Sequence, residues 1–286
     1  MTGGARIVAR LALREAARRR VLAVIVALTV AFVVLYWFGA RELFSTIDEI
    51  DATGVLDARS LAGATFLGLA MFATLFLGTV LAVFLTHGAV RGDAERGLLQ
   101  PLVVRPLSRA AYLVGRLAAA VLVSGAYVVV TFSAAVLITG LVGGWWPDDP
   151  EGAALRLVLA TTCVCALGLL GSVLLGATAT GIAVLMAFGA GLVAGLLGAI
   201  GEALGSGTLV DVADVMSWVL PFEGLYRDAL QRLVADAAGG GVTETLVQLG
   251  PLGGSKPAGP LFLPYVALWL AAVVAGAARL LGRRDL

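Results

Sequence analysis

Charged residues are scarce in this sequence. Only 14% of the 286 residues are Asp, Glu, Lys or Arg, whereas soluble domains carry about 25%. Hydrophobic residues make up 60% of the chain, and the mean hydropathy is +0.98. The formal net charge is only +1, so no basic excess favours nucleic acid. This composition excludes a cytosolic enzyme, a disordered protein and a nucleic-acid binder. It predicts a single integral membrane domain over residues 1–286.

Residue types that carry chemistry are also few. The one histidine, His87, stands near the end of an apolar run, where a solvated helix end is the favoured interpretation. Cys163 and Cys165 are two apart on an expected helix, so their side chains diverge and neither a disulfide nor a shared metal site is expected. We therefore expect no metal and no cofactor.

No nucleotide-binding motif is present either. Residues 250–256 resemble a phosphate-binding loop faintly, but Ser255 replaces the required glycine and Pro257 follows Lys256 where Ser or Thr is needed. No ionisable residue lies deep in an apolar run, which argues against an ion-coupled transporter. Arg156 stands at the start of such a run, where its side chain is expected to snorkel to the interface. The chain is not expected to be an enzyme, so any ATP hydrolysis must come from a partner.

Long stretches without charge dominate the chain. They cover residues 21–40, 60–90, 117–147, 157–201 and 257–278. A helix rises about 1.5 Å per residue, so about 20 residues cross the roughly 30 Å of hydrocarbon in a bilayer. Four stretches therefore predict one span each. The 45 residues of the fourth stretch are too many for one span.

Two glycines, Gly176 and Gly181, flank a small polar stretch within that long run and mark the expected turn. We therefore predict an all-α integral membrane protein with six transmembrane helices. Their expected bounds are about residues 21–40, 63–88, 112–142, 154–175, 180–201 and 261–281.

The charges between the spans are unevenly distributed. The side that holds both termini and the 87–116 loop carries 14 basic and 4 acidic residues, and the other side carries 6 and 15. Lys and Arg near span ends favour the cytoplasm. Both termini and the loop are therefore expected to be cytoplasmic, in a multi-pass protein of the cell (plasma) membrane. The first span is interpreted as an uncleaved anchor, because Tyr36, Trp37 and Phe38 stand where signal cleavage needs small residues.

The N-terminal residues 1–20 carry a regular arginine pattern. The arginines spaced four apart are Arg6, Arg10, Arg14 and Arg18. On a helix they form one stripe. The apolar residues beside it are Ile7, Val8, Leu11 and Leu13. The pattern predicts an amphipathic elbow helix on the inner leaflet, with its guanidinium groups near lipid headgroups. A plain topology signal is the alternative.

Residues 202–260 form the only sizeable extracytoplasmic segment. Pro221 suits the first position of a helix. The period after it is helical, and Gly239 to Gly241 stop it. The apolar face comprises Phe222, Leu225, Tyr226, Ala229, Leu230, Leu233 and Val234. The charged face comprises Glu223, Arg227, Asp228, Gln231, Arg232 and Asp236.

A shorter helix is expected before it. Its apolar residues are Leu209, Val212, Met216 and Val219. These short outer helices between spans 5 and 6 are expected to lie at the outer interface or to cap the entrance between spans, with substrate binding as the alternative. In the fifth span, Gly191 and Gly195 form a GxxxG pattern that Gly198 and Gly201 continue. Such glycines let helices approach closely. Packing within the chain is favoured over a dimer interface.

The 87–116 loop is the most polar cytoplasmic segment between spans. It contains a charged turn, a short apolar piece at residues 98–104, Pro106 as a stop and Ser108 as a possible N-cap. A short, partly apolar helix that projects into the cytoplasm favours docking into the groove of a partner. The alternative is a loop that lies on the membrane surface.

Within this loop the sequence resembles permease subunits of the ABC-2 family. Those subunits carry, between their second and third spans, a segment like E-x-G-T-x-x-x-L-L-x-x-P-x-S-R-x-x-x-x-x-G-K/R. The residues that match it are Glu95, Gly97, Pro106, Ser108, Arg109, Gly115 and Arg116. Leu98 stands where the family has Thr, and Pro101 interrupts the short helix. The expected layout of spans, elbow, termini and outer helices resembles the same family.

The resemblance implies the permease subunit of an ATP-driven ABC transporter, and an exporter. It implies that residues 91–109 form a coupling loop that docks into a separate ATPase subunit. The residues so implied are Glu95 and Arg96 for polar contacts, Leu98, Leu99 and Leu102 for apolar contacts, and Arg105, Arg109 and Arg116 for acidic groups or lipid headgroups, with Gly97, Pro106 and Ser108 completing the motif. It also implies two ATPase subunits and a second permease copy or paralogue.

Two other functions remain open on the residues alone. A non-transport membrane scaffold or sensor subunit could use the same loop to hold a cytoplasmic partner. An integral membrane enzyme is less favoured, because no constellation of carboxylates and histidine is present.

Overall fold

The computed structural model describes residues 2–18, 20–50, 58–89, 109–233, 259 and 261–283. Every regular element within these ranges is an α-helix, as predicted. In chain order the helices are α1 (Thr2–Arg18), α2 (Arg20–Ile50), α3 (Ala58–Thr86), α6 (Arg109–Gly143), α7 (Pro150–Leu174), α8 (Ala177–Leu204), α9 (Gly207–Val219), α10 (Pro221–Arg232) and α12 (Phe262–Gly282).

Six of these helices are long and apolar enough to cross a membrane, which confirms the predicted number of spans. They are α2, α3, α6, α7, α8 and α12. Several are longer than the uncharged runs. The 35 residues of α6 extend over about 52 Å, which exceeds the roughly 30 Å of hydrocarbon. The uncharged runs therefore predicted the number of spans, whereas the helix ends differ from the ends of the runs, as in α2 and α6, which both begin before theirs.

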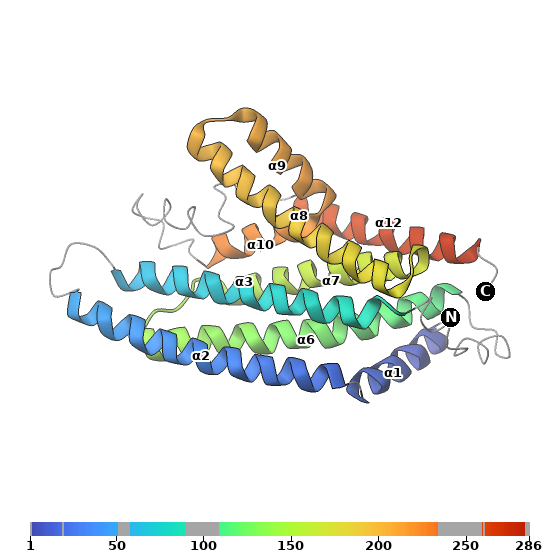
Figure 1. Ribbon diagram of the computed structural model, residues 1–286, viewed down its shortest axis with the longest axis horizontal. Helices are drawn as coiled ribbons and strands as arrows, with labels where there is room; N and C mark the ends of the chain where they lie inside the picture. Colours follow the sequence, from blue (N-terminus) through green and yellow to red (C-terminus); the bar gives the residue numbers. More distant parts are fainter. Residues whose placement is uncertain are drawn as a thin grey trace.

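The long helices α2, α3, α6 and α7 run side by side along the long axis of the molecule (Figure 1). Both ends of the chain lie at one end of this bundle, as an even number of spans requires. The end of α3 and the start of α6 lie there too, and α1 sits at an angle beside the start of α6. The helix α8 leaves the bundle obliquely and forms a hairpin with α9.

Local sequence signals set the breaks between the later helices. Asp149 caps α7 and Pro150 occupies its first turn. The turn between α7 and α8 is shorter than predicted, because α8 begins directly after Gly176 and only Leu175 and Gly176 are non-helical. The helix α8 ends at Gly205, whose φ of +65° favours glycine. Pro221 begins α10, as predicted, since a proline lacks the N–H that the preceding helix would need.

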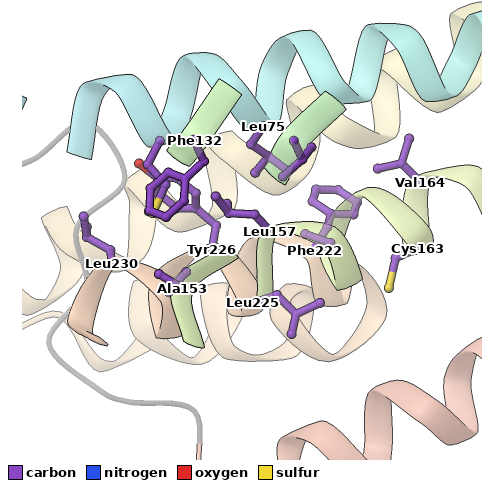
Figure 2. Packing of buried hydrophobic residues seen from close by; sticks show 14 of the residues in the cluster. Leu75, Phe132, Ala153, Leu157, Cys163, Val164, Phe222, Leu225, Tyr226 and Leu230 are labelled. Atoms are coloured by element: carbon purple, nitrogen blue, oxygen red, sulfur yellow. The ribbon is translucent and has the colours of Figure 1, made fainter. Parts of the chain in front are cut away.

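The main hydrophobic core lies between α3, α6, α7 and α10. Figure 2 shows Leu75 of α3, Phe132 of α6 and Leu157 of α7 around Phe222 and Tyr226 of α10. All five side chains are buried. The short helix α10 is therefore part of the bundle core, where its burial contributes about 25 cal/mol per Å² of apolar surface removed from water.

A second, smaller core lies at the end of the bundle that holds both termini. It joins α1, α6, α7 and α12 through Val8, Leu113, Val173 and Leu281. A helix is present at the predicted position as α1, which packs across the start of α6, and its role as an elbow at the membrane surface stays a prediction.

Candidate functional site

The predicted coupling loop falls mostly outside the described residues. The predicted site residues that lie there are Glu95, Arg96, Gly97, Leu98, Leu99, Leu102, Arg105, Pro106 and Ser108. Of the predicted set, the structure places Arg109 and Arg116, both in the first turns of α6. The helix begins at Arg109, directly after the residue expected to cap it.

The two described ends of this loop are tied together. The Tyr112 hydroxyl of α6 donates a hydrogen bond of 2.5 Å to the backbone carbonyl of Ala89, which follows α3. Arg116 Nε donates to the same hydroxyl at 3.3 Å, and its guanidinium carbon lies 5.8 Å from the centre of the Tyr112 ring. Both Tyr112 and Ala89 are buried in the second core. Sequence reasoning missed Tyr112, because a lone tyrosine at a span end carries no distinguishing pattern.

The N-terminal helix α1 completes the base on which this loop stands. Its buried side, Val8 and Ala12, packs on α6, since the two helices lie side by side. The exposed residues on its other sides are Arg6, Ile7, Arg10, Leu11 and Arg14. A helix surface that mixes exposed arginines with exposed aliphatic residues suits a membrane interface. Contact with the inner leaflet remains a prediction.

At the opposite end, ion pairs hold α10 against α7. Arg156 of α7 is only 5% exposed, and its Nε donates to Asp228 Oδ2 of α10. Arg156 also donates through Nη1 to the carbonyl of Gly152 at 3.0 Å. The expectation that Arg156 snorkels to the interface was therefore wrong. A carboxylate from a helix 72 positions later compensates its charge inside the protein.

A more exposed ion pair extends this network. Arg232 Nη1 of α10 lies 2.7 Å from Asp149 Oδ2, whose other oxygen accepts the backbone N–H of Gly152 at 2.8 Å. Arg232 and then the Gly152 N–H hold the pKa of Asp149 below its usual range. One carboxylate thus caps α7 and binds the end of α10.

The charged face predicted for α10 is only partly turned to solvent. Glu223 and Asp228 are both buried, although the helical period grouped them on a polar face. Glu223 Oε1 lies 2.8 Å from Arg227 Nε, one turn later in the same helix. Burial raises the pKa of Glu223 to about 7; Arg227 opposes this rise and Asp214 of α9 adds to it. The helical period grouped the charged residues correctly, but neighbouring helices cover part of that face, while Arg232 keeps 42% of its side chain exposed.

The glycine stripe of α8 is filled from within the chain. A side chain at Gly191 would meet the Phe222 ring at 2.6 Å, and one at Gly195 would meet Glu223 Oε1 at 2.7 Å. Gly198 and Gly201 likewise face Ala213 and Leu209 of α9. The interpretation of this stripe as packing within the chain is therefore confirmed.

The two cysteines and His87 pack against neighbouring residues of the chain. Cys163 and Cys165 are free and buried in the core, and Ser124 Oγ lies 3.5 Å from Cys165 Sγ. The His87 ring lies edge-on to Phe84, with Nδ1 3.0 Å from the Val83 carbonyl. Among the described residues, no group of His, Cys, Asp and Glu gathers in a way that could hold a metal ion.

Comparison with known families supplies the family. No curated protein matches the chain. The family model described as ABC-2 family transporter protein matches residues 6–286, which is nearly the whole chain. The six apolar helices fit that family. The chain therefore belongs to the ABC-2 family of transporter proteins, as a multi-pass, permease-type membrane protein.

Proposed function

We propose that this chain is the permease subunit of an ATP-driven exporter and that residues 91–109 couple it to a separate ATPase. One observation carries the proposal. A segment that resembles the ABC-2 coupling segment lies in the sequence between α3 and α6. The Tyr112–Ala89 hydrogen bond joins the facing ends of these two helices, and the family match covers residues 6–286. A segment tied at its base moves both helices together when a partner pushes on it.

The described contacts give that push a route into the membrane. Tyr112 and Leu113 place the start of α6 in the core shared with α1, α7 and α12. From there α6 continues as one unbroken helix to Gly143. It packs along α3 and α7, and α7 in turn holds α10 through Arg156 and Asp228. In this proposal, motion at the loop would reach the far end through these packed helices.

The energy in this proposal comes from the partner. The sequence carries no complete phosphate-binding loop, so two ATPase subunits would bind and hydrolyse ATP while two permease copies, or this chain and a paralogue, form the path for the cargo. Glu95 and Arg96 would make polar contacts with the ATPase, and Leu98, Leu99 and Leu102 would fill its cleft.

The test is reconstitution with a separately encoded ABC ATPase from the same organism. The two chains are co-purified in mild detergent and placed in lipid discs, and ATP hydrolysis is measured with and without the permease. We expect a stable assembly and stimulated hydrolysis. Charge reversals Glu95→Arg and Arg109→Glu should abolish the stimulation. The matched control is Arg41→Glu, which reverses an exposed charge in the C-terminal part of α2. This variant should leave the stimulation of ATP hydrolysis unchanged.

The outcomes separate transport coupling from anchoring. If the assembly forms and both loop variants stimulate ATP hydrolysis as strongly as the parent chain, the result would support a scaffold or sensor that only holds its partner. A permease that purifies alone and binds no ATPase would overturn the coupling assignment altogether.

A further inference from the structure

Glu223 is a carboxyl group enclosed where three helices meet. It is only 3% exposed. Its own helix is α10, and its Oε1 lies so close to Gly195 of α8 that a Cβ there would be 2.7 Å away. The adjacent Phe222 fills the space above Gly191 one turn earlier on α8. Two neighbouring residues of α10 therefore seat against two glycines of α8, and one of them is ionisable.

The charged partner of Glu223 compensates it incompletely. Arg227 Nε lies 2.8 Å from Glu223 Oε1, but the two atoms are not aligned for a hydrogen bond. Neither atom has another hydrogen-bond partner among the described residues. A buried carboxylate oxygen without an aligned donor is costly, since low-dielectric surroundings disfavour the charged form.

The other charges around this position do not supply a second cation. Asp214 of α9 contributes a further negative charge that favours protonation of Glu223. The α10 residue Asp228 is already paired with Arg156 of α7. The α8 surface at Gly195 is uncharged, and its charged residue, Glu202, comes two turns later. The charged residues of α3 and α12 are Arg59 and Arg279, which stand near the helix ends, and Arg283 directly follows α12.

We propose that Glu223 is a proton-binding site that sets how firmly α10, which is held on α7, packs against the α8–α9 hairpin. The packed arrangement binds the proton, because a neutral carboxyl fits the glycine surface without a charge to desolvate. The arrangement loosens when the proton leaves, because a carboxylate is better solvated away from α8. The contact between the two parts of the outer end therefore responds to pH. This inference concerns the permease alone and does not depend on coupling to an ATPase.

The direction of the pH effect follows from linkage. Burial raises the pKa of Glu223 from 4.5 to about 7. A group whose pKa is raised in the packed state contributes stability that is fully present below its unperturbed pKa and is lost as the pH rises through the raised one. Packing is therefore tightest below pH 4.5, weakens up to about pH 7 and is constant above it. The packing equilibrium should change on the order of 50-fold between roughly pH 5 and pH 8.

The experiment measures a distance across this contact in the full chain in lipid discs. Spin labels are attached through Thr208→Cys on α9 and Leu155→Cys on α7, two exposed positions, with Cys163→Ala and Cys165→Ala removing the native thiols. The distribution of distances between the two labels is recorded by double electron–electron resonance spectroscopy from pH 5 to pH 8. Infrared spectra over the same range follow the C=O band of protonated carboxyl groups.

We expect a single short distance at pH 5 and a growing second population towards pH 8, with loss of a carboxyl band at the same midpoint. Glu223→Gln should keep the pH 5 distribution throughout and lack that band. Glu202→Gln, the matched change on α8, should behave like the parent chain. A parent distribution that is independent of pH, or a Glu223→Gln variant that keeps the same midpoint, would overturn the inference.

A second variant serves if Glu223→Gln does not fold. Asp214→Asn changes a half-buried residue and removes the neighbouring negative charge that favours protonation. Its midpoint should move to lower pH while the acid-side distribution stays the same. An unchanged midpoint in this variant would show that Glu223 is not the titrating group.

Discussion

The Tyr112 hydroxyl donates a hydrogen bond of 2.5 Å to the carbonyl of Ala89, a residue 23 positions earlier in the chain. This bond closes the base of the predicted coupling loop, and its two residues belong to the core that also holds α1, α7 and α12. A loop that receives force from a partner needs a stiff base. The bond provides one by linking two spans at their facing ends.

Removing this hydroxyl should weaken the base. Tyr112→Phe deletes a buried hydrogen bond and leaves the Ala89 carbonyl unpaired, at a cost of about 1–3 kcal/mol. We expect a lower thermal midpoint in detergent and a smaller stimulation of the ATPase. Tyr127→Phe is the matched control on the same helix, because that hydroxyl is buried and has no hydrogen-bond partner in the described part of the chain. Equal effects of the two variants would contradict a special role for Tyr112.

The Arg156–Asp228 pair should behave as a buried pair. Asp228→Leu leaves the Arg156 guanidinium buried and unpaired, which costs about 3–5 kcal/mol. The double variant Arg156→Leu with Asp228→Leu should recover most of this loss, since no charge then remains to be solvated. The comparison is Arg232→Gln, whose side chain is 42% exposed in its pair with Asp149 and should cost at most about 1 kcal/mol. The measurement is the unfolding midpoint of the parent chain and the three variants. A double variant that is no more stable than Asp228→Leu would argue against a buried Arg156–Asp228 pair.

The glycine stripe of α8 should show position-dependent tolerance. Gly191→Ala places a methyl group 2.6 Å from the Phe222 ring and should cost about 1–3 kcal/mol through overpacking. Gly189→Ala on the same helix meets nothing within 4 Å and should be neutral, or stabilising by up to about 1 kcal/mol. Thermal unfolding and the oligomeric state are measured together. Gly191→Ala that alters only the oligomeric state would return the stripe to a dimer interface.

Asp149 should act mainly as a helix cap. Asp149→Ala removes the oxygen that accepts the Gly152 N–H and should cost about 1 kcal/mol, whereas Asp149→Asn keeps a capping oxygen and should lose less. Because the pKa of Asp149 is lowered, its contribution is present above the ordinary value of 3.8 and is lost only as the pH falls through the lowered one. The difference between the parent chain and Asp149→Ala should therefore be flat from pH 5 to pH 8. A slope in that range would point to another titrating group.

The orientation in the membrane is directly testable. Single cysteines are introduced by Ser108→Cys and Asp148→Cys in the chain with Cys163→Ala and Cys165→Ala. From the charge distribution, a membrane-impermeant thiol reagent applied to intact cells should label only the Asp148→Cys protein. The Ser108→Cys protein should react only after the membrane is opened. The reverse pattern would invert the topology and place the coupling loop outside.

The local breaks in the fold could be predicted because each has a short-range cause. Pro221 starts α10 since a proline has no N–H for the preceding helix, and a glycine at position 176 separates α7 from α8. The turn was predicted to extend to Gly181, but it ends at Gly176, because Ala177 and the threonines after it already belong to α8. Alanine has a high helix propensity, so α8 can begin directly after Gly176 and no longer turn is needed.

The ion pairs that join α10 to α7 and to Asp149 could not be predicted, because their members come from distant parts of the chain. Arg156 and Asp228 are 72 positions apart, and nothing in the neighbourhood of either names the other. The role of Tyr112 could likewise not be predicted, because its hydrogen-bond partner Ala89 is 23 positions away in the sequence. The coupling role of Glu95 to Ser108 rests on the resemblance to the family motif alone, and both the role and the contacts stay proposals.

The sequence by itself determined that this is a six-span, all-helical membrane protein, because hydrocarbon thickness converts directly into a count of uncharged residues. It also determined the family, through a motif that the family match then supported. Only the tertiary structure decided that Glu223 and Asp228 lie inside the protein. A helical period shows which residues share a face, but the burial of that face depends on the helices that pack against it, and for α10 those helices also cover part of the charged face.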